Sequence, residues 1–356
     1  MKVGIIGLPQ TGKKTLFQIL TGNDVQEQAK VSKPVPGAAD IMDSRFDRLV
    51  DLYEPKKNVR ARIELVLLPK MEAETISKGD IFRDIADMDA VCHVVRAFED
   101  DSVYHAQGSV DALRDFEMVN SELVMHDQIF VEKRIERLEA MVKKIKDEDQ
   151  KKELALMYRL REFLEQEKPL RLAELTQDEE KMIRSYPFIT RKKLVAVVNV
   201  GEDDIDNEDL MSAFAPMCEK DDIKVMPVSA KLESEIAMLD TREEKQEFLE
   251  DLGIQHTALE TLTGLCLESL DLISFFTVGK DEVRQWLLRK GSNAPKAAGV
   301  IHSDLERGFI RAEVFKYNDL VEAGSEPELK KAGKIHVEGK DYIVEDGDIL
   351  NIRFAV

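Results

Sequence analysis

The sequence predicts an α/β protein whose main sheet is mostly parallel and covered by helices on both faces. Short apolar runs alternate with helical segments in the first part of the chain and return after a long helical stretch. Near the C-terminus the pattern changes to short β-branched runs separated by turns. With 356 residues, of which 43% are hydrophobic, the chain is long enough for two or three globular domains.

The first element is a buried strand, KVGIIG, which leads into GLPQTGKKT and then a helical segment. Gly7, Gly12 and Lys13 match the phosphate-binding template Gly-x-x-x-x-Gly-Lys-[Ser/Thr], but Lys14 stands where a hydroxyl is expected. In such a loop the backbone N–H groups and the helix N-terminus face the anion, and the lysine contacts the outer phosphates. We therefore expect a phosphate site here.

Four further apolar runs are predicted to be buried strands of the same sheet. They are IELVLL (63–68), AVCHVV (90–95), KLVAVVNV (193–200) and IKVMPVSA (223–230).

A helical pair is predicted between the second and third of these runs. Apolar residues recur at heptad spacing, first at Val131, Ile135, Leu138, Val142 and Ile145, and then at Met157, Leu160 and Leu164. Two antiparallel helices joined at residues 146–152 would follow, with a tip carrying Lys143, Lys144, Lys146, Lys151 and Lys152. The tip is either a solvated helix surface or a nucleic-acid contact. Thr176 and Glu179 form a capping box that predicts another short helix before Pro187.

The last part of the chain predicts a small mixed sheet with one helix. Its strands are FFTVG, IRAEVF, KIHVEG and DYIVEDGDILNIRF, and the helix is placed around Val283 to Lys290.

The net charge of −19 is unevenly distributed. The acidic excess lies in the part that contains the phosphate loop, whereas the helical pair and the last part are nearly neutral. This net negative charge argues against a protein that binds nucleic acid over its whole surface. Because the chain has no run of eighteen apolar residues and no secretory signal pattern, we expect a cytoplasmic protein without a membrane partner.

The chain resembles the YchF or Obg-like ATPases of the P-loop GTPase class along nearly its whole length. The stretches that carry the resemblance are GLPQTGKKTLFQILTG, MDAVCHVVRAFEDD, VVNVGEDD, PVSAK, ISFFTVGKDEVRQW, APKAAGVIHSDLERGFIRAEV and GKDYIVEDGDILNIRF. The resemblance implies a Ras-like G domain with a coiled-coil insertion and a C-terminal ubiquitin-like β-grasp (TGS) domain. The expected boundaries are 1–120 and 191–273 for the G domain, 121–190 for the insertion and 274–356 for the TGS domain.

The resemblance also implies a base pocket that prefers adenine. Asn199, Val200 and Glu202 correspond to an Asn-x-x-Glu variant of the guanine motif Asn-Lys-x-Asp, and Ser229 to Lys231 stand in the position of the fifth motif. Since the longer Glu side chain displaces the acceptor pair that guanine needs, guanine selectivity should weaken.

Three departures affect the groups that would position Mg²⁺. Lys14 replaces the metal-binding hydroxyl, and Leu67 and Lys70 stand where the family's Asp-x-x-Gly motif has Asp and Gly. In addition, no Thr occurs between Thr21 and Thr75, so the first switch lacks the Thr that would close on the γ-phosphate and the metal. We expect Lys14 to substitute in part for the metal electrostatically; the alternative is a decayed site in which Lys14 points into solvent.

His105 is the catalytic candidate. It matches a mobile-loop histidine that the family is thought to use in place of a glutamine, and imidazole is suited to orienting or deprotonating water. His93, within an apolar run, is interpreted as a residue of the core or of a sheet end.

The function predicted is a YchF-like nucleotide-binding protein that prefers ATP or ADP over GTP, with Mg²⁺-dependent hydrolysis weak or lost. Whether it is an enzyme is left open. The alternative is a pseudo-NTPase scaffold that acts through its coiled coil and TGS domain. Ribosome or RNA is the implied partner, contacted through the basic tip and the TGS face with Arg284, Arg289, Lys290 and Lys296. The residues predicted to bind nucleotide are Gly7, Leu8, Pro9, Gln10, Thr11, Gly12, Lys13, Lys14, Thr15, Asn199, Val200, Glu202, Ser229, Ala230 and Lys231.

Overall fold

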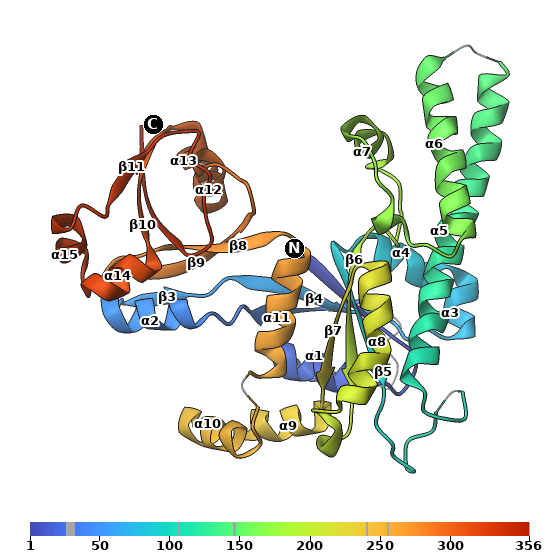
Figure 1. Cartoon of the computed structure of the whole chain (residues 1–356), viewed down its shortest axis with the longest axis horizontal. Helices are drawn as coiled ribbons and strands as arrows, with labels where there is room; N and C mark the ends of the chain where they lie inside the picture. The colour runs from blue at the N-terminus through green and yellow to red at the C-terminus, as the bar shows by residue number, and fades with distance from the viewer. Residues whose placement is uncertain (26–32, 106, 145–146, 240, 255, 356) are drawn as a thin grey trace. The chain divides into compact units, whose positions relative to one another are not determined.

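The structure, a computed structural model, describes residues 1–25, 33–105, 107–144, 147–239, 241–254 and 256–355 (Figure 1). The chain forms two compact units. The first comprises Met1–Ala38 and Glu64–Ala258, and the second comprises Ala39–Ile63 and Leu259–Val356. Residues 39–63 and 259–273, which the sequence assigned to the G domain, thus pack within the second unit. As functional divisions, the four predicted segments stay a prediction.

The sheet of the first unit has the order β2-β4-β1-β5-β6-β7. Its strands are β1 (Lys2–Ile6), β2 (Val35–Asp40), β4 (Arg62–Leu67), β5 (Ala90–Arg96), β6 (Lys193–Asn199) and β7 (Ile223–Val228). From β4 to β7 every neighbouring pair is parallel. The predicted α/β fold with a mostly parallel sheet is confirmed, and it is consistent with a P-loop G domain. Strand β2 was not predicted, because the sequence VPGAAD has no apolar run and contains Pro and Gly.

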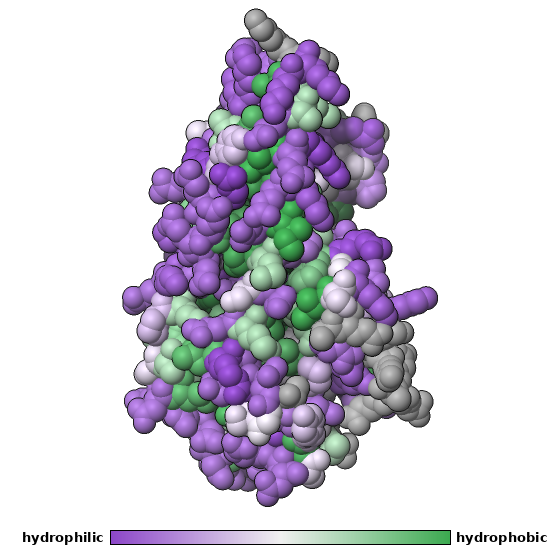
Figure 2. Space-filling model, turned by 90° about the vertical axis from the view of Figure 1, so that its right-hand side faces the viewer, coloured by the Kyte–Doolittle hydropathy of each residue, from purple (hydrophilic) through white to green (hydrophobic). Residues whose placement is uncertain are grey.

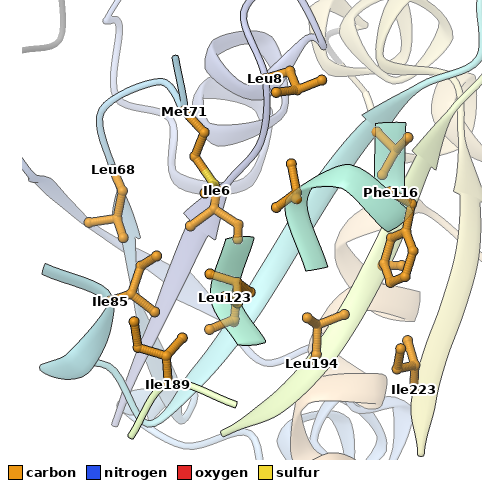
Figure 3. Close-up of a cluster of buried hydrophobic side chains, with 14 of the residues drawn as sticks. Ile6, Leu8, Leu68, Met71, Ile85, Phe116, Leu123, Ile189, Leu194 and Ile223 are labelled. Carbon is orange, nitrogen blue, oxygen red and sulfur yellow. The ribbon is translucent and has the colours of Figure 1, made fainter. Parts of the chain in front are cut away.

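The first unit also contains a set of α-helices. They are α1 (Lys13–Thr21), α3 (Ala73–Lys78), α4 (Asp80–Ala86), α5 (Ala112–Val142), α6 (Glu148–Glu165), α7 (Gln177–Ile183), α8 (Glu208–Asp221), α9 (Ala230–Met238) and α10 (Arg242–Asp251), with 3-10 turns at Leu170–Leu172 and Glu202–Asp204. One buried cluster joins Ile6 of β1, Phe116 of α5 and Leu194 of β6 (Figure 3). His93 of β5 is buried beside Phe116, as the sequence predicted, with ring centroids 5.2 Å apart.

The predicted helical pair is formed by α5 and α6, but both helices begin at other residues than expected. Helix α5 begins at Ala112 rather than near Ser121, because Asp111 caps it by accepting from Arg114 N at 3.0 Å. Helix α6 begins at Glu148, inside the predicted joint, because Asp147 caps it. The end of the predicted tip therefore belongs to a helix.

The two helices pack through the predicted apolar residues. Val131, Ile135 and Leu138 of α5 are buried with Met157, Leu160 and Leu164 of α6. Figure 2 shows hydrophilic side chains over most of this helical hairpin and hydrophobic ones gathered between the helices. Ile145 and Lys146 lie outside the described residues. The capping box of Thr176 and Glu179 is confirmed at the start of α7.

The second unit contains a mixed sheet in the order β11-β10-β12-β8-β9-β3. Its strands are β3 (Lys57–Val59), β8 (Leu272–Thr277), β9 (Glu282–Arg289), β10 (Phe309–Lys316), β11 (His336–Glu338) and β12 (Asp348–Phe354). Its helices are α2 (Ser44–Tyr53), α11 (Ala258–Ser269), α12 (Ala294–Ile301), α13 (Ser303–Arg307), α14 (Tyr317–Ala323) and α15 (Glu326–Lys331). Helix α12 packs Ala294, Ala297 and Ala298 against Phe275.

The helix predicted around Val283 to Lys290 is wrong, since residues 283–289 lie in strand β9. Val283, Trp286 and Leu287 have the spacing of one helix face, which explains the error. Pairing with β8 decides the outcome, because Trp286 lies opposite Phe275 in the antiparallel ladder.

No helix in the described parts of the chain is both long enough and apolar enough to cross a membrane.

Candidate nucleotide-binding site

The carboxyl ends of five parallel strands meet at one edge of the first unit's sheet. The phosphate loop follows β1, and the loop with His105 follows β5. Asn199 ends β6, and Ser229 follows β7. In open parallel sheets this edge is where ligands bind. The structure thus gathers at one edge residues that lie far apart in the sequence.

The phosphate loop depends on two glycines with positive φ. Gly7 has φ of 148°, and a Cβ added to it would lie 2.3 Å from the carbonyl oxygen of Val94. Gly12 has φ of 85°, and its Cβ would lie 2.2 Å from Asn199 Nδ2. Both positions therefore exclude any side chain, for reasons of conformation and of space.

Lys13 is the first residue of α1 and is almost fully buried, with 7% of its surface exposed. Its Nζ donates to the carbonyl oxygens of Gly7, at 2.7 Å, and of Leu8. Burial, and next the positive charge of Lys70, lower the Lys13 pKa to about 7. Burial, followed by the charge of Lys13, also lowers the pKa of His93 to about 3, so this imidazole is neutral.

Asn199 joins the phosphate loop to the loop after β7. Its Nδ2 donates to the carbonyl oxygen of Thr11 at 3.0 Å, and its Oδ1 accepts from Ala230 N at 3.0 Å. The side chain is buried, and Ser229 beside it caps α9 by accepting from Leu232 N. The asparagine predicted for base recognition is therefore also a structural link between two loops.

Glu202 and Lys231 meet at the solvent-exposed side of the same edge. Lys231 Nζ lies 2.6 Å from Glu202 Oε1, and this hydrogen bond raises the Lys231 pKa. The remaining predicted residues surround the loop: Leu8, Thr11, Val200 and Ala230 are buried, Pro9, Lys14 and Thr15 are half-buried, and Gln10 is exposed.

The loop that carries His105 is held by residues that the sequence analysis did not single out. Arg96, buried at the end of β5, donates to the carbonyl oxygens of Phe98 at 3.1 Å and Val103 at 3.0 Å. His105 Nδ1 accepts from Gln107 N at 3.1 Å, and its Nε2 lies 3.0 Å from Asp115 Oδ2, though not aligned as a hydrogen bond. The signal for Arg96 in the sequence is its position at the end of the buried strand AVCHVV, where a charged residue stands next to the loop.

Asp115 lies in the first turn of α5, with 3% of its side chain exposed, and its Oδ1 accepts from Arg114. Because the partner of His105 comes from the next helix, no local pattern in the sequence marks it. Both ring nitrogens of His105 face protein groups, and 10% of its side chain is exposed.

Three residues stand at the positions that the sequence analysis associated with Mg²⁺, namely Lys14, Leu67 and Lys70. Leu67 is 1% exposed and offers no ligand atom, and Lys14 and Lys70 are cations. Within the described residues, no group of three or more His, Cys, Asp and Glu side chains could hold a metal ion. Part of the first switch, residues 26–32, lies outside the described residues.

A glycine-bounded loop between β1 and α1, a buried lysine at its end and a link to Asn199 define a P-loop nucleotide-binding protein. A model of the YchF GTPase C-terminal family, described as a protein of unknown function (DUF933), matches residues 272–355. The ribosome-binding ATPase YchF of Bacillus subtilis is 39% identical, with 100% of both chains covered. Obg-like ATPase 1 of Homo sapiens is 36% identical over 99% of this chain and 92% of its own length.

Among solved structures, the YchF GTPase of Schizosaccharomyces pombe aligns with a TM-score of 0.84 and 29% identity, covering 99% of this chain and 97% of its own. The chain belongs to the YchF and Obg-like ATPase family.

Proposed function

We propose that this chain binds an adenine nucleotide, associates with the ribosome, and hydrolyses the nucleotide weakly or not at all. The proposal rests on a contrast at the phosphate loop. Gly7, Gly12 and Lys13 are the residue types of an anion-binding loop. Leu67 and Lys70 stand at the positions where the family has the Asp and Gly that organise the metal. The names of the relatives, ribosome-binding ATPase and Obg-like ATPase, support the nucleotide and the ribosome.

The base side supports adenine over guanine. Guanine recognition needs a carboxylate that accepts from two N–H groups together. One oxygen of Glu202 is already paired with Lys231 at 2.6 Å, and the glutamate is one methylene longer than aspartate. GTP remains the weaker ligand in this proposal.

Weak hydrolysis follows from two features. Phosphoryl transfer depends on charge stabilisation and alignment, which a metal ion normally supplies. In addition, His105 is engaged by Gln107 and Asp115. The same features favour the second candidate, a nucleotide-bound scaffold without turnover.

One experiment tests the nucleotide and the metal together. Mass spectrometry of the purified protein should identify co-purifying ADP or ATP, and metal analysis of the same sample should find less than one Mg²⁺ per nucleotide. GDP or GTP as the main species, or steady phosphate release at a rate normal for the relatives, would reject the proposal.

The contact with the ribosome is proposed at the tip of the helical hairpin. Lys151 lies 2.6 Å from Glu148 and Lys152 lies 3.7 Å from Asp149, so their charges are partly compensated. Among the described residues, Lys143 and Lys144 are exposed and form no ion pair.

Co-sedimentation with ribosomes tests this contact. Replacing Lys143 and Lys144 by Gln should weaken ribosome binding. It should also lower the slope of log affinity against log salt concentration by about one for each lysine that binds a phosphate. Replacing Lys151 and Lys152, which belong to the same tip but pair with carboxylates of α6, should weaken binding to a smaller extent. Equal binding by both variants and the unchanged chain would exclude the tip.

A further inference from the structure

The segment that follows β4 runs along the phosphate loop. Leu68 N donates to the carbonyl oxygen of Ile5 at 3.1 Å, and Met71 N donates to that of Gly7 at 3.1 Å. Lys70 therefore lies in a stretch that is hydrogen-bonded to the strand and the loop that would hold the phosphates. Its place beside the loop is set by the parallel pairing of β4 and β1.

Buried side chains fix this segment on both sides of Lys70. Leu68 is 1% exposed and Met71 is 0% exposed, and Figure 3 shows Met71 directed toward Ile6 in the core cluster. On the far side, Thr75 Oγ1 donates to the carbonyl oxygen of Lys70 at 2.8 Å. The backbone of Lys70 is thus held, while its side chain remains 43% exposed and able to change partner.

The ammonium group of Lys70 is paired with Glu72. The distance from Lys70 Nζ to Glu72 Oε2 is 2.9 Å, and the Glu72 side chain is 35% exposed. An ion pair this open to water is weak, so a polyphosphate can compete for the lysine.

Three lysines therefore share this end of the site. Burial is the main cause of the lowered Lys13 pKa; among neighbouring charges Lys70 contributes most, and Lys14 also lowers it. Lys14 follows Lys13 in the chain, and the hydrogen bond from Met71 N to the Gly7 carbonyl oxygen holds the backbone next to Lys70 against the loop, so all three lysines lie at the phosphate loop. Like charges held together in this way repel, and an anion placed among them relieves that repulsion.

We propose that Lys70, together with Lys14, takes the place of Mg²⁺ in neutralising the terminal phosphates of the bound nucleotide, and that Glu72 holds Lys70 until the phosphates displace it. Two ammonium groups carry the same total charge as one Mg²⁺, and each offers three donors to phosphate oxygens. They cannot reproduce octahedral coordination with retained waters. The site would bind nucleotide tightly without aligning it for transfer. This inference rests on the proposed nucleotide binding.

Glu72 offers a competing interpretation. A single carboxylate together with phosphate oxygens and waters can hold Mg²⁺. If Glu72 did so, Lys70 would be its resting partner and nothing more. The two interpretations predict opposite effects of removing the Glu72 charge.

Calorimetric titration of the full chain with ADP, in EDTA and in Mg²⁺, separates them. The unchanged chain should bind ADP equally well in both buffers. Lys70→Met should weaken binding in EDTA by about ten- to a hundredfold, the effect of losing one or two charge-assisted hydrogen bonds. Glu72→Gln should strengthen it severalfold, because it releases Lys70.

Lys2→Met is the matched control. Lys2 pairs with Glu64 at 3.8 Å with similar exposure, but it lies at the opposite end of β1 from the phosphate loop. Like Lys70→Met, the substitution Lys2→Met removes one positive charge from the first unit, but it should leave ADP binding unchanged. A thermal melt of each variant confirms that it is folded.

The outcomes are distinguishable. Equal ADP affinity for Lys70→Met and Lys2→Met would overturn the role of Lys70 while leaving the proposed function intact. Binding that requires Mg²⁺ and is lost in Glu72→Gln would overturn it in favour of a metal on Glu72. If the unchanged chain bound no ADP in either buffer, the proposed function would fail, and this inference with it.

Discussion

The two halves of the candidate site differ in how firmly the fold holds them. On the phosphate side, Lys13 and Asn199 are buried, and Gly7 and Gly12 have no room for a Cβ. On the metal side, the side chains of Lys70 and Glu72 are 43% and 35% exposed and touch each other.

This difference explains which half can vary. A change on the phosphate side removes buried hydrogen bonds or creates a steric clash, so it costs stability as well as binding. A change of Lys70 or Glu72 alters only partly exposed charges and leaves the core intact.

Among these substitutions, Gly12→Ala should weaken nucleotide binding most. The new Cβ would clash with Asn199 Nδ2, and φ of 85° is strained for alanine. We expect nucleotide binding to weaken by more than about a hundredfold, because a strain of roughly 1–2 kcal/mol is added to the clash. Gly22→Ala is the control: φ is 71° there, but nothing lies within 4 Å. Similar calorimetric affinities in the two variants would show that the close packing of the loop is unimportant.

Asn199→Ala should have the next largest effect. It leaves the carbonyl of Thr11 and the N–H of Ala230 without their partner, at a cost of about 2–4 kcal/mol in the free energy of unfolding. Urea denaturation measures this cost. Asn207→Ala, which removes the cap of α8 and an exposed hydrogen bond to Asp204, should cost about 1 kcal/mol. Equal losses would mean that Asn199 does not link the two loops.

The pH dependence of binding tests the burial of Lys13. With a pKa of about 7 in the free protein, Lys13 must gain a proton to hold phosphate at pH 8. Each nucleotide should then take up about one proton, and the affinity should fall by up to about tenfold for each pH unit above 7. Calorimetry in two buffers of different ionisation enthalpy measures this uptake.

The stability of the free protein should change with pH in the direction opposite to the nucleotide affinity. The folded pKa of Lys13 lies below its ordinary value of 10.5, so the unfolded chain binds more protons between these values. The contribution of Lys13 to the free energy of unfolding therefore rises with pH from about 7 to 10.5. No proton uptake at pH 8 would contradict both expectations.

The smallest effect is expected from Asp115→Asn. Asparagine keeps the shape but loses the charge that faces His105 Nε2. Amide hydrogens in residues 103–105 and 107–109 should exchange faster, by a factor of about five for a loss near 1 kcal/mol, while those of β5 stay unchanged. Arg96→Met should loosen residues 98–104 more, because it removes several hydrogen bonds to backbone carbonyls. Unchanged exchange in both variants would show that neither residue orders the loop.

Much of the fold could be predicted because its signals are local. Buried strands such as KLVAVVNV are short and apolar, and the capping box of Thr176 and Glu179 needs only four residues. Prediction failed where neighbours decide the structure. Strands β2 and β3 carry weak patterns, and residues 283–290 are compatible with a helix until β8 pairs with them.

The sequence alone determined which residue types occupy the phosphate loop and the two positions where the family has the Asp and Gly of its Asp-x-x-Gly motif. Both depend on residue types at fixed spacing: only glycine suits the positive φ of Gly7 and Gly12, and neither Leu67 nor Lys70 can ligate Mg²⁺. The tertiary structure decided which distant groups meet. Strand order and register place Asn199 against Thr11, and helix α5 brings Asp115 to His105. The same parallel pairing lays Lys70 beside the loop, because β4 neighbours β1 in the sheet although a long stretch of chain separates them in the sequence.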